Sequence, residues 1–314
     1  MRAVTIADGK LTWSEHPDPV PGDTELLVAV RAAGVNRADL IQRQGLYPAP
    51  PGSPPDIPGL ELAGEVLAVG RRVSRFQPGD RVMALTGGGA QAELALADEG
   101  CAMPVPDGIS WAEAGGFPEA FATAHDALFA IGRLQMGETV LVTGAAGGVG
   151  TAAVQVAAAS GARVVASTRH DEACEPLRRL GAAVAATPDD ALDHGPFDVV
   201  VELVGAASLG GALRALATGA RIAVIGVGGG ARLELDLLAL LNRRASVAGA
   251  TLRSRPVAAK GAVVGAMARA VLPALAEGRV SVPVAATVAM AEAPAAYEQF
   301  ATGGKLGKIV LVHE

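Results

Sequence analysis

One glycine-rich turn constrains this 314-residue chain more than any other feature. Residues 140–143 form a short β-branched apolar run, which is typical of a strand buried on both faces. Residues 144–150 (GAAGGVG) follow, and a small-residue pattern with helical spacing comes next. Strand, glycine turn and helix predict a dinucleotide site, in which Gly147 lets the backbone approach a pyrophosphate and Gly150 lets the helix pack on the sheet. The alternative is a glycine turn without a ligand.

The end of the following strand favours one form of the cofactor. An NAD site usually places Asp or Glu about twenty residues beyond the glycines to bind the ribose 2′-hydroxyl. Here that position is Ser167, followed by Thr168 and Arg169. Two hydroxyls and a guanidinium suit a ribose phosphate, because Arg can fork onto phosphate oxygens. The sequence therefore predicts NADPH, unless Arg169 is only a solvated surface charge.

Composition narrows the class of partner. The net charge is −6 and the sequence pI is about 5.5, so no nucleic acid and no anionic membrane is expected as a partner. Two cysteines make neither a disulfide framework nor a four-thiolate zinc site. No secretory signal follows Met1, and no apolar run is long and uninterrupted enough to span a bilayer. A cytoplasmic location is expected.

The hydrophobic period divides the chain into two domains. Residues 1–117 show mostly period two, which predicts a barrel-like, largely antiparallel unit. Alternating strands and helices follow, which predicts a Rossmann doubly wound parallel sheet over residues 118–278, and residues 279–314 should return to the first domain. The fold class is thus α/β. Strands are expected at residues 25–33, 62–70, 81–85, 92–97, 140–143, 163–167, 198–203, 220–225, 246–252, 280–282 and 306–313, and helices at 112–131 (interrupted near Pro118), 267–278 and 291–300.

Several runs carry a resemblance to a known family. They are residues 34–48, 59–64, 78–82, 144–150 and 304–311. With these runs, the chain resembles the zinc-independent medium-chain dehydrogenases/reductases and is most similar to the quinone oxidoreductases. Residues 36–45 and 251–255 are most similar to the stress-inducible quinone oxidoreductases of animals. The resemblance implies a GroES-like catalytic domain, an NADPH-binding Rossmann domain and a homodimer.

The residues argue against a metal at the family's catalytic position. Zinc-dependent relatives have Cys where this chain has Asn36, and Gly-His-Glu where it has Gly59-Leu60-Glu61. Neither a thiolate nor an imidazole is present there to bind zinc. Without a Lewis acid the hydride acceptor must already be electron-poor. The sequence thus predicts an NADPH:quinone oxidoreductase; the alternatives are an enoyl or alkenal double-bond reductase and a non-catalytic NADPH-binding sensor.

The resemblance also implies the site residues. Asn36 lies beside the nicotinamide and substrate, where its amide can bind a carbonyl oxygen or the ribose, although Asn is also common in turns. Tyr47 borders the acceptor pocket as a stacking partner or proton donor, or else only packs. Asp39 is expected to orient the loop of Asn36. The expected cofactor contacts are Thr123, Ala145, Ala146, Gly147, Gly148, Val149, Gly150, Ser167, Thr168, Arg169, Val204, Ile225, Gly226, Val227, Thr251 and Leu252.

Two further expectations concern positions where this chain differs from its close relatives and the assembly of the chain into a dimer. Close relatives carry Tyr where this chain has Ala186-Thr187-Pro188, and Lys where it has Ala173 or Cys174, so Arg169 must compensate or the preference for NADPH is weak. Residues 246–251 are expected to form an uncharged edge strand. Such an edge invites pairing across a two-fold axis, which predicts a homodimer.

Overall fold

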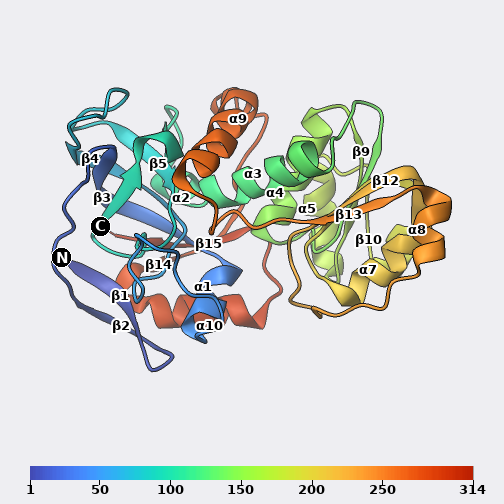
Figure 1. Cartoon of the computed structure of the whole chain (residues 1–314), viewed down its shortest axis with the longest axis horizontal. Helices are drawn as coiled ribbons and strands as arrows, with labels where there is room; N and C mark the ends of the chain where they lie inside the picture. Colours follow the sequence, from blue (N-terminus) through green and yellow to red (C-terminus); the bar gives the residue numbers. More distant parts are fainter. Residues whose placement is uncertain (314) are drawn as a thin grey trace. The chain divides into compact units, whose positions relative to one another are not determined.

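The computed structural model describes residues 1–313 and divides the chain into two compact units. One unit contains Met1–Glu119 together with the segment from Leu252 onward, and the other contains Ala120–Thr251. They are called here the catalytic unit and the nucleotide unit, after the expectations above. Figure 1 shows the chain with labels on most of the elements named below.

The catalytic unit is built on a seven-stranded sheet whose central strand is β3 (Glu25–Val35). β3 pairs antiparallel with β4 (Glu61–Val69), β6 (Leu94–Asp98) and the C-terminal strand β15 (Lys308–Val312). The order along the sheet is β14-β15-β3-β4-β5-β7, and only the β14–β15 pair is parallel. The remaining strands of the unit are β5 (Arg81–Leu85), β7 (Ala102–Pro104), β14 (Val284–Ala289) and a separate hairpin of β1 (Arg2–Ala7) and β2 (Lys10–Glu15).

Alternation along these strands produces the core of the unit. Leu26, Val28 and Val30 of β3 are buried at every second position, as expected of a strand with one face on the core. Tyr297 of α10 packs into the same core and is fully buried. The helices of the unit are α1 (Arg37–Arg43), α2 (Trp111–Gly115), α9 (Val257–Ala276) and α10 (Ala293–Thr302), with the 3-10 turns η1 (Glu99–Cys101) and η5 (Met290–Glu292).

The nucleotide unit is a six-stranded, all-parallel sheet with the order β10-β9-β8-β11-β12-β13. The chain runs outward from β8 through β9 to β10, then returns to the other side of β8 and runs outward again. The topological switch therefore lies between β8 and β11, where open parallel sheets bind ligands beyond the carboxyl ends of their strands. The strands are β8 (Thr139–Val142), β9 (Arg163–Ser167), β10 (Val184–Ala186), β11 (Phe197–Glu202), β12 (Leu216–Val224) and β13 (Ser246–Gly249).

The connections between these strands are mostly short helices. α4 (Gly148–Ala159) is apolar on nearly all sides and largely buried, which fits a helix packed closely on a sheet. The others are α3 (Pro118–His125), the π-helical turn η2 (Asp126–Ile131), η3 (Asp171–Ala173), α5 (Cys174–Arg179), α6 (Pro188–Leu192), α7 (Ala206–Ala212), η4 (Leu213–Ala215) and α8 (Leu237–Arg243).

The predicted fold class is confirmed, and most expected strands lie within a few residues of their predicted positions. The helix expected over residues 112–131, with its interruption near Pro118, is present as α2, α3 and η2, and the break falls between Gly115 and Pro118. One local expectation was wrong: the strand expected at residues 280–282 begins only at Val284, beyond Pro283. The short edge strand β10 was not predicted.

Helix α9 begins ten residues before the expected helix at residue 267, and it changes the domain assignment. Its buried side chains recur every three or four residues: Lys260, Val264, Met267, Val271 and Leu275. It packs against η1 and β7, so residues 252–278 belong with the catalytic unit rather than with the nucleotide unit. By its length and composition alone, α9 could also cross a membrane, whereas no apolar run of that length was expected from the sequence.

Candidate functional site

The glycine turn after β8 has the geometry of a phosphate-binding loop. Gly144 has a positive φ of 59°, and the Ala145 N–H donates to the carbonyl of Ser167 at the end of β9 (3.0 Å). Gly147 is the N-cap residue of α4 and offers no side chain to the helix start. The first N–H groups of a helix have no partner within it. The turn therefore presents free backbone donors and the positive end of a helix dipole, which suit an anionic phosphate.

Two glycines of the turn have different reasons to be glycine. A Cβ on Gly150 would lie 2.6 Å from the Cα and carbonyl oxygen of Ala145, so the close approach of α4 to the turn requires glycine there. A Cβ on Gly147 would meet only the Gly144 carbonyl, at 3.5 Å, and the φ of Gly147 is −74°. Nothing in the chain itself therefore requires glycine at position 147. A ligand lying against the backbone of Gly147 would require glycine there, and the residues of the turn fit a dinucleotide.

The end of β9 presents one charged group to solvent. Ser167 and Thr168 are buried, and the Thr168 hydroxyl accepts a hydrogen bond from the His170 N–H (3.2 Å). Arg169 is exposed, and within residues 1–313 it has no hydrogen-bond or ion-pair partner. Of the three residues expected at the ribose phosphate, the guanidinium is thus the one that is free to bind an anion.

Glu202 organises the loops at the switch point. Its carboxylate, at the end of β11, is fully buried and accepts from the hydroxyls of Thr143 (2.8 Å) and Ser208 (2.7 Å). It also accepts from the N–H groups of Val204 and Gly205, both at 2.7 Å. The carboxylate is therefore committed to fixing the loop after β11 against the end of β8, and it does not point at a ligand.

The other predicted cofactor residues are distributed as follows. Val204, Ile225, Gly226, Val227 and Thr251 follow the carboxyl ends of β11, β12 and β13, so they share the sheet edge with the glycine turn. Thr123 is buried on α3, and its role toward the cofactor stays a prediction. Leu252 lies in the catalytic unit and is buried there.

In the catalytic unit, Asn36 is held by a buried ion pair. It follows β3 directly, and its Nδ2 donates to Glu61 Oε1 (2.8 Å) while its Oδ1 accepts from Lys308 Nζ (2.7 Å). Lys308 and Glu61 form a salt bridge of 2.6 Å and are 3 % and 0 % exposed. Lys308 also donates to the Val35 carbonyl (3.2 Å), which uses all three of its donors. The expected alternative of an Asn that only forms a turn is thus insufficient, because its side chain is bound on both sides.

Gly34 makes this arrangement possible. A Cβ at that position would lie 2.3 Å from Glu61 Oε1 and 2.9 Å from the carbonyl of Gly115. The second oxygen of Glu61 accepts from the backbone N–H of Glu119 (2.9 Å). The end of β3, the start of β4, β15 and the start of α3 therefore meet at one carboxylate.

Asp39 orients the loop of Asn36, as expected. It is fully buried on α1, and its carboxylate accepts from the N–H groups of Asn36 (2.8 Å) and Gly59 (3.1 Å). Burial raises the pKa of Asp39 from 3.8 to about 6, against the opposing effect of these two hydrogen bonds and of the charges on Lys308 and Arg253.

The raised pKa of Asp39 gives a pH-dependent contribution to stability. The pKa of this carboxyl is higher in the folded protein than in the unfolded chain. Its protonated form therefore stabilises the folded state fully at a pH below the unfolded pKa, and this contribution is lost as the pH rises through about 6. Relative to an Asp39→Asn variant, wild type should lose roughly 2.5 kcal/mol of unfolding free energy between pH 4 and 7.5. Urea unfolding followed by the fluorescence of Trp13 and Trp111 measures this, because both tryptophans lie in the catalytic unit. Parallel pH curves for the two proteins would contradict it.

Tyr47 lies beside a buried arginine that the sequence did not single out. The Arg253 guanidinium lies 5.1 Å from the centre of the Tyr47 ring and donates to the carbonyls of Gly87 (2.8 Å) and Tyr47 (3.1 Å) and to Gln42 Oε1 (2.6 Å). The Tyr47 hydroxyl has no hydrogen-bond partner within residues 1–313. Burial raises the pKa of Tyr47, so the group is a neutral phenol with a proton to donate.

Sequence reasoning assigned no role to Glu61, Lys308 or Arg253. Each belongs to a run used for the resemblance, and nothing in its immediate neighbours indicates burial. The one sequence signal that could have identified these residues is a charged residue inside an apolar strand or a small-residue segment. Such a charge is expected to be buried, and a buried charge needs a partner. The partner lies 247 positions away for Glu61 and 211 for Arg253, so pattern analysis alone did not find it.

The described part of the chain contains no group of three or more His, Cys, Asp and Glu side chains placed to hold a metal ion. Asn36 and Leu60 occupy the positions where the sequence comparison above expects zinc ligands in other branches of the superfamily.

Comparison with known proteins decides the family. Residues 22–133 match the alcohol dehydrogenase GroES-like domain, and residues 148–269 match the domain described as zinc-binding dehydrogenase. A quinone oxidoreductase of Mus musculus is 32% identical over 249 residues, covering 75% of this chain and 74% of the mouse protein. The chain belongs to the zinc-independent quinone oxidoreductases of the medium-chain dehydrogenase/reductase superfamily. Its similarity to the animal stress-inducible subgroup stays a prediction.

Solved structures agree with this membership in the quinone oxidoreductase family. An alcohol dehydrogenase superfamily protein of Novosphingobium aromaticivorans has a TM-score of 0.88 at 30% identity, with 100% of both chains covered. A quinone oxidoreductase of Pseudomonas syringae has a TM-score of 0.87 at 26% identity, with 99% of both chains covered. A mycobacterial protein complexed with NADPH has a TM-score of 0.88 at 25% identity, with 100% of both chains covered. The chain is thus an oxidoreductase of a family that uses nicotinamide cofactors.

Proposed function

We propose that this protein is an NADPH:quinone oxidoreductase that transfers a hydride to a quinone without zinc. When bound, NADPH supplies the hydride, and with one proton the quinone becomes the quinol. The observation that carries the proposal is the Asn36–Glu61–Lys308 network, in which an amide fixed by a buried ion pair stands at the sequence position of a zinc-binding cysteine in zinc-dependent relatives. An amide is a weak electrophilic catalyst, so the acceptor must be reactive by itself.

The network also indicates how Asn36 acts. Its Nδ2 faces Glu61 and, at 3.4 Å, the Gly34 carbonyl, while Lys308 uses one lone pair of Oδ1. An amide oxygen has two lone pairs, so the remaining capacity of Asn36 is as an acceptor. Of the two roles expected for Asn36, this geometry favours accepting a hydroxyl of the nicotinamide ribose over donating to the carbonyl of the substrate.

Arg169 supports NADPH as the cofactor. It is exposed and unpaired at the end of β9, where NAD-specific sites carry an acid. Arg169→Met should raise the KM for NADPH about tenfold and leave the KM for NADH unchanged, because only NADPH carries the 2′-phosphate. Arg179→Met provides a matched control, since Arg179 is an exposed arginine of α5 in the same unit. Equal effects on the two cofactors would contradict the role of Arg169.

A second candidate, the reduction of enals, is favoured by Tyr47. Reduction of a carbon–carbon double bond needs a proton delivered to carbon, and the Tyr47 phenol is unpaired and neutral at physiological pH. Quinol oxygens, by contrast, can take protons from solvent.

One experiment separates the candidates: oxidation of NADPH and NADH with 1,4-benzoquinone and, in parallel, with a 2-enal, for wild type and Tyr47→Phe. Turnover of the quinone with NADPH preferred, unaffected in Tyr47→Phe, is the expected result. Turnover of the enal alone, lost in Tyr47→Phe, would assign the protein to the double-bond reductases. Tight NADPH binding with no oxidation in either assay would leave a cofactor-binding sensor.

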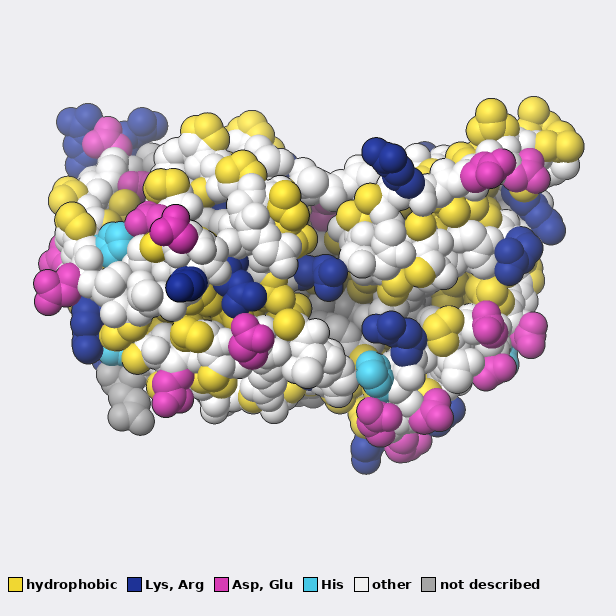
Figure 2. Space-filling model, turned by 90° about the horizontal axis from the view of Figure 1, so that it is seen from below, with side chains coloured by type: hydrophobic (Ala, Val, Ile, Leu, Met, Phe, Trp, Pro, Cys, Tyr) yellow, Lys and Arg dark blue, Asp and Glu magenta, His cyan; other side chains and the backbone are white. Residues whose placement is uncertain are grey.

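We also propose a homodimer that pairs along β13. This strand is the edge of its sheet and all four residues are exposed. Beside it in sequence, Leu237, Leu238 and Leu241 of α8 are 64–71% exposed. Hydrophobic side chains gather at the right-hand end of the face in Figure 2, the end at which Figure 1 places α8. A monomeric mass by light scattering would exclude this assembly.

A further inference from the structure

A cavity of about 390 Å³ lies within the catalytic unit, apart from Asn36 and Tyr47. Its walls include the proline-rich loop of residues 50–54, the loop of residues 85–89, strand β6, and the start of α9 with the segment before it. A cavity of this size is within the range of small-molecule sites. Neither Asn36 nor Tyr47 lines it, and Arg253 links its wall to the site described above by donating to the carbonyls of Gly87 and Tyr47.

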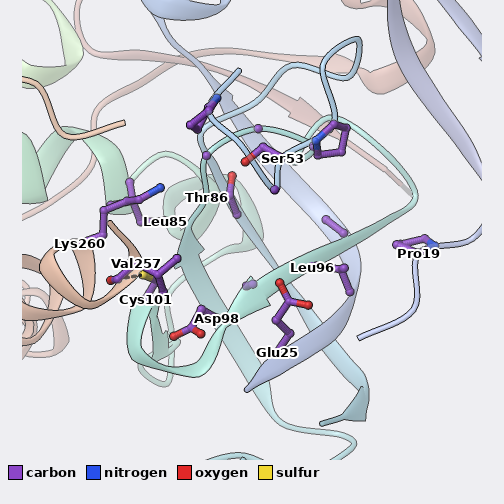
Figure 3. Close-up of a pocket in the computed structure, with 18 of the residues that line it drawn as sticks. Pro19, Glu25, Ser53, Leu85, Thr86, Leu96, Asp98, Cys101, Val257 and Lys260 are labelled. Atoms are coloured by element: carbon purple, nitrogen blue, oxygen red, sulfur yellow. Dashed lines mark hydrogen bonds between the residues drawn. The ribbon is translucent and has the colours of Figure 1, made fainter. Parts of the chain in front are cut away.

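Lys260 of α9 directs its ammonium into this cavity. Figure 3 shows the side chain pointing toward Thr86 and Ser53. The residue is only 6% exposed, and within residues 1–313 its ammonium forms no hydrogen bond or salt bridge. No fully buried side-chain nitrogen or oxygen of the described residues lacks a partner, so the ammonium must retain access to the cavity. A buried charge without a partner is costly, which indicates that a counter-charge belongs beside it.

The surroundings of Lys260 define what that counter-charge can be. A Cβ on Gly87 would stand 2.4 Å from Ser53 Oγ and 3.4 Å from Lys260 Nζ, so an ammonium and a hydroxyl converge on the bare Gly87 backbone. Arg255 lines the cavity as well. Two acids, Glu25 and Asp98, also line it.

Both acids are already engaged in local structure. Glu25 accepts from the Gly22 N–H (2.8 Å), and Asp98 accepts from Thr24 Oγ1 (2.8 Å) and from the Gly100 N–H (2.9 Å). Neither forms a salt bridge with Lys260. Their negative charge disfavours a dianion in the same cavity, whereas a monoanion beside Lys260 is compatible with it.

The rest of the wall is apolar. Ile57, Leu85, Leu96 and Val257 contribute side chains, together with the prolines of the 50–54 loop. Cys101 also lines the cavity; burial and the nearby Asp98 raise its pKa to about 11, so it is a neutral thiol rather than an anion that could neutralise Lys260. The site therefore suits a molecule with a single negative charge at one end and an apolar body.

From these contacts we infer that the cavity binds a small organic carboxylate, with its carboxylate on Lys260 and Ser53 and its apolar body against the proline and leucine walls. The inference is independent of the proposed function, because it concerns a cavity that neither Asn36 nor Tyr47 lines. It adds to the protein a second small-molecule site.

Calorimetric titration of the full-length protein with benzoate, and with benzyl alcohol as the neutral analogue, tests this site. Wild type should bind benzoate saturably with a Kd below about 1 mM and at least about tenfold more tightly than benzyl alcohol. Lys260→Met should weaken benzoate binding about 10- to 100-fold and leave the affinity for benzyl alcohol nearly unchanged. Lys10→Met is the matched control, since Lys10 is an exposed lysine of β2 in the same unit.

Two further variants distinguish loss of the ammonium from a folding defect in Lys260→Met. Lys260→Arg retains the charge and should retain benzoate binding, and Ser53→Ala should weaken it about three- to tenfold. NADPH oxidation is measured on the same samples, so that failure of the proposed function is scored separately. Equal binding of benzoate and benzyl alcohol by wild type, or unchanged benzoate binding in both Lys260→Met and Ser53→Ala, would overturn the inference and leave a cavity filled by water.

Discussion

Replacement of Lys308 by Met is expected to lower the unfolding free energy of the catalytic unit by about 3–5 kcal/mol. The substitution leaves the Glu61 carboxylate fully buried, with only the Asn36 amide and the Glu119 N–H as hydrogen-bond donors. A buried charge that has lost its partner carries most of its desolvation cost without compensation. Guanidinium unfolding followed by tryptophan fluorescence measures the loss, because Trp13 and Trp111 report on this unit.

Two companion variants make the result specific. Lys10→Met removes an exposed lysine and should change the unfolding free energy by less than about 0.5 kcal/mol. In the double variant Glu61→Gln/Lys308→Met neither member of this ion pair is left as a buried charge, so more than half of the lost stability should return. A Lys308→Met protein within about 1 kcal/mol of wild type would show that the ion pair contributes little, and the double variant would then show no recovery.

The second large effect concerns cofactor binding by the nucleotide unit. Gly147→Ala should weaken NADPH binding at least about 100-fold while shifting the melting temperature by no more than a degree or so. The chain has room for a methyl group at this position, since its nearest neighbour would be the Gly144 carbonyl at 3.5 Å. A pyrophosphate lying against the same backbone would not have that room.

Gly150→Ala is the contrasting substitution in the same turn. Its Cβ would overlap the backbone of Ala145 at 2.6 Å, so it should cost about 1–3 kcal/mol of stability in addition to cofactor affinity. Calorimetric titration with NADPH and thermal melting by circular dichroism measure the two properties separately. If Gly147→Ala bound NADPH as wild type does, the glycine turn would not be the pyrophosphate site.

How far the sequence predicts this fold depends on how local each signal is. The strand β9 was predicted with its observed bounds, because five consecutive residues carry its pattern and Gly161 marks its start. The helix α9 begins at Val257, ten residues earlier than predicted, because its first turns contain Ala, Gly and Lys and show no apolar period. The three residues of β10 are too few to carry a pattern at all.

The same distinction applies to the candidate site. Gly147 and Arg169 were predicted because a dinucleotide turn and the next strand end are adjacent in sequence and follow fixed spacing. Asn36 was predicted by resemblance, but the reason that its amide is held in place was not. That reason lies in Lys308, which reaches Asn36 from the last strand of the chain. No local pattern reports a contact across 272 positions.

The divided catalytic unit has a consequence for how the protein folds during synthesis. Glu61 leaves the ribosome early, and Lys308 follows 247 positions later. At about 5–20 residues per second, that interval lasts roughly 12 to 50 seconds. The nucleotide unit, Ala120–Thr251, is one continuous segment and can finish folding first, although it is made second. Until β15 arrives, the Glu61 carboxylate has no lysine beside it and residues 32–35 of β3 have a free edge, so the nascent catalytic unit is the part of this protein that depends on protection from aggregation.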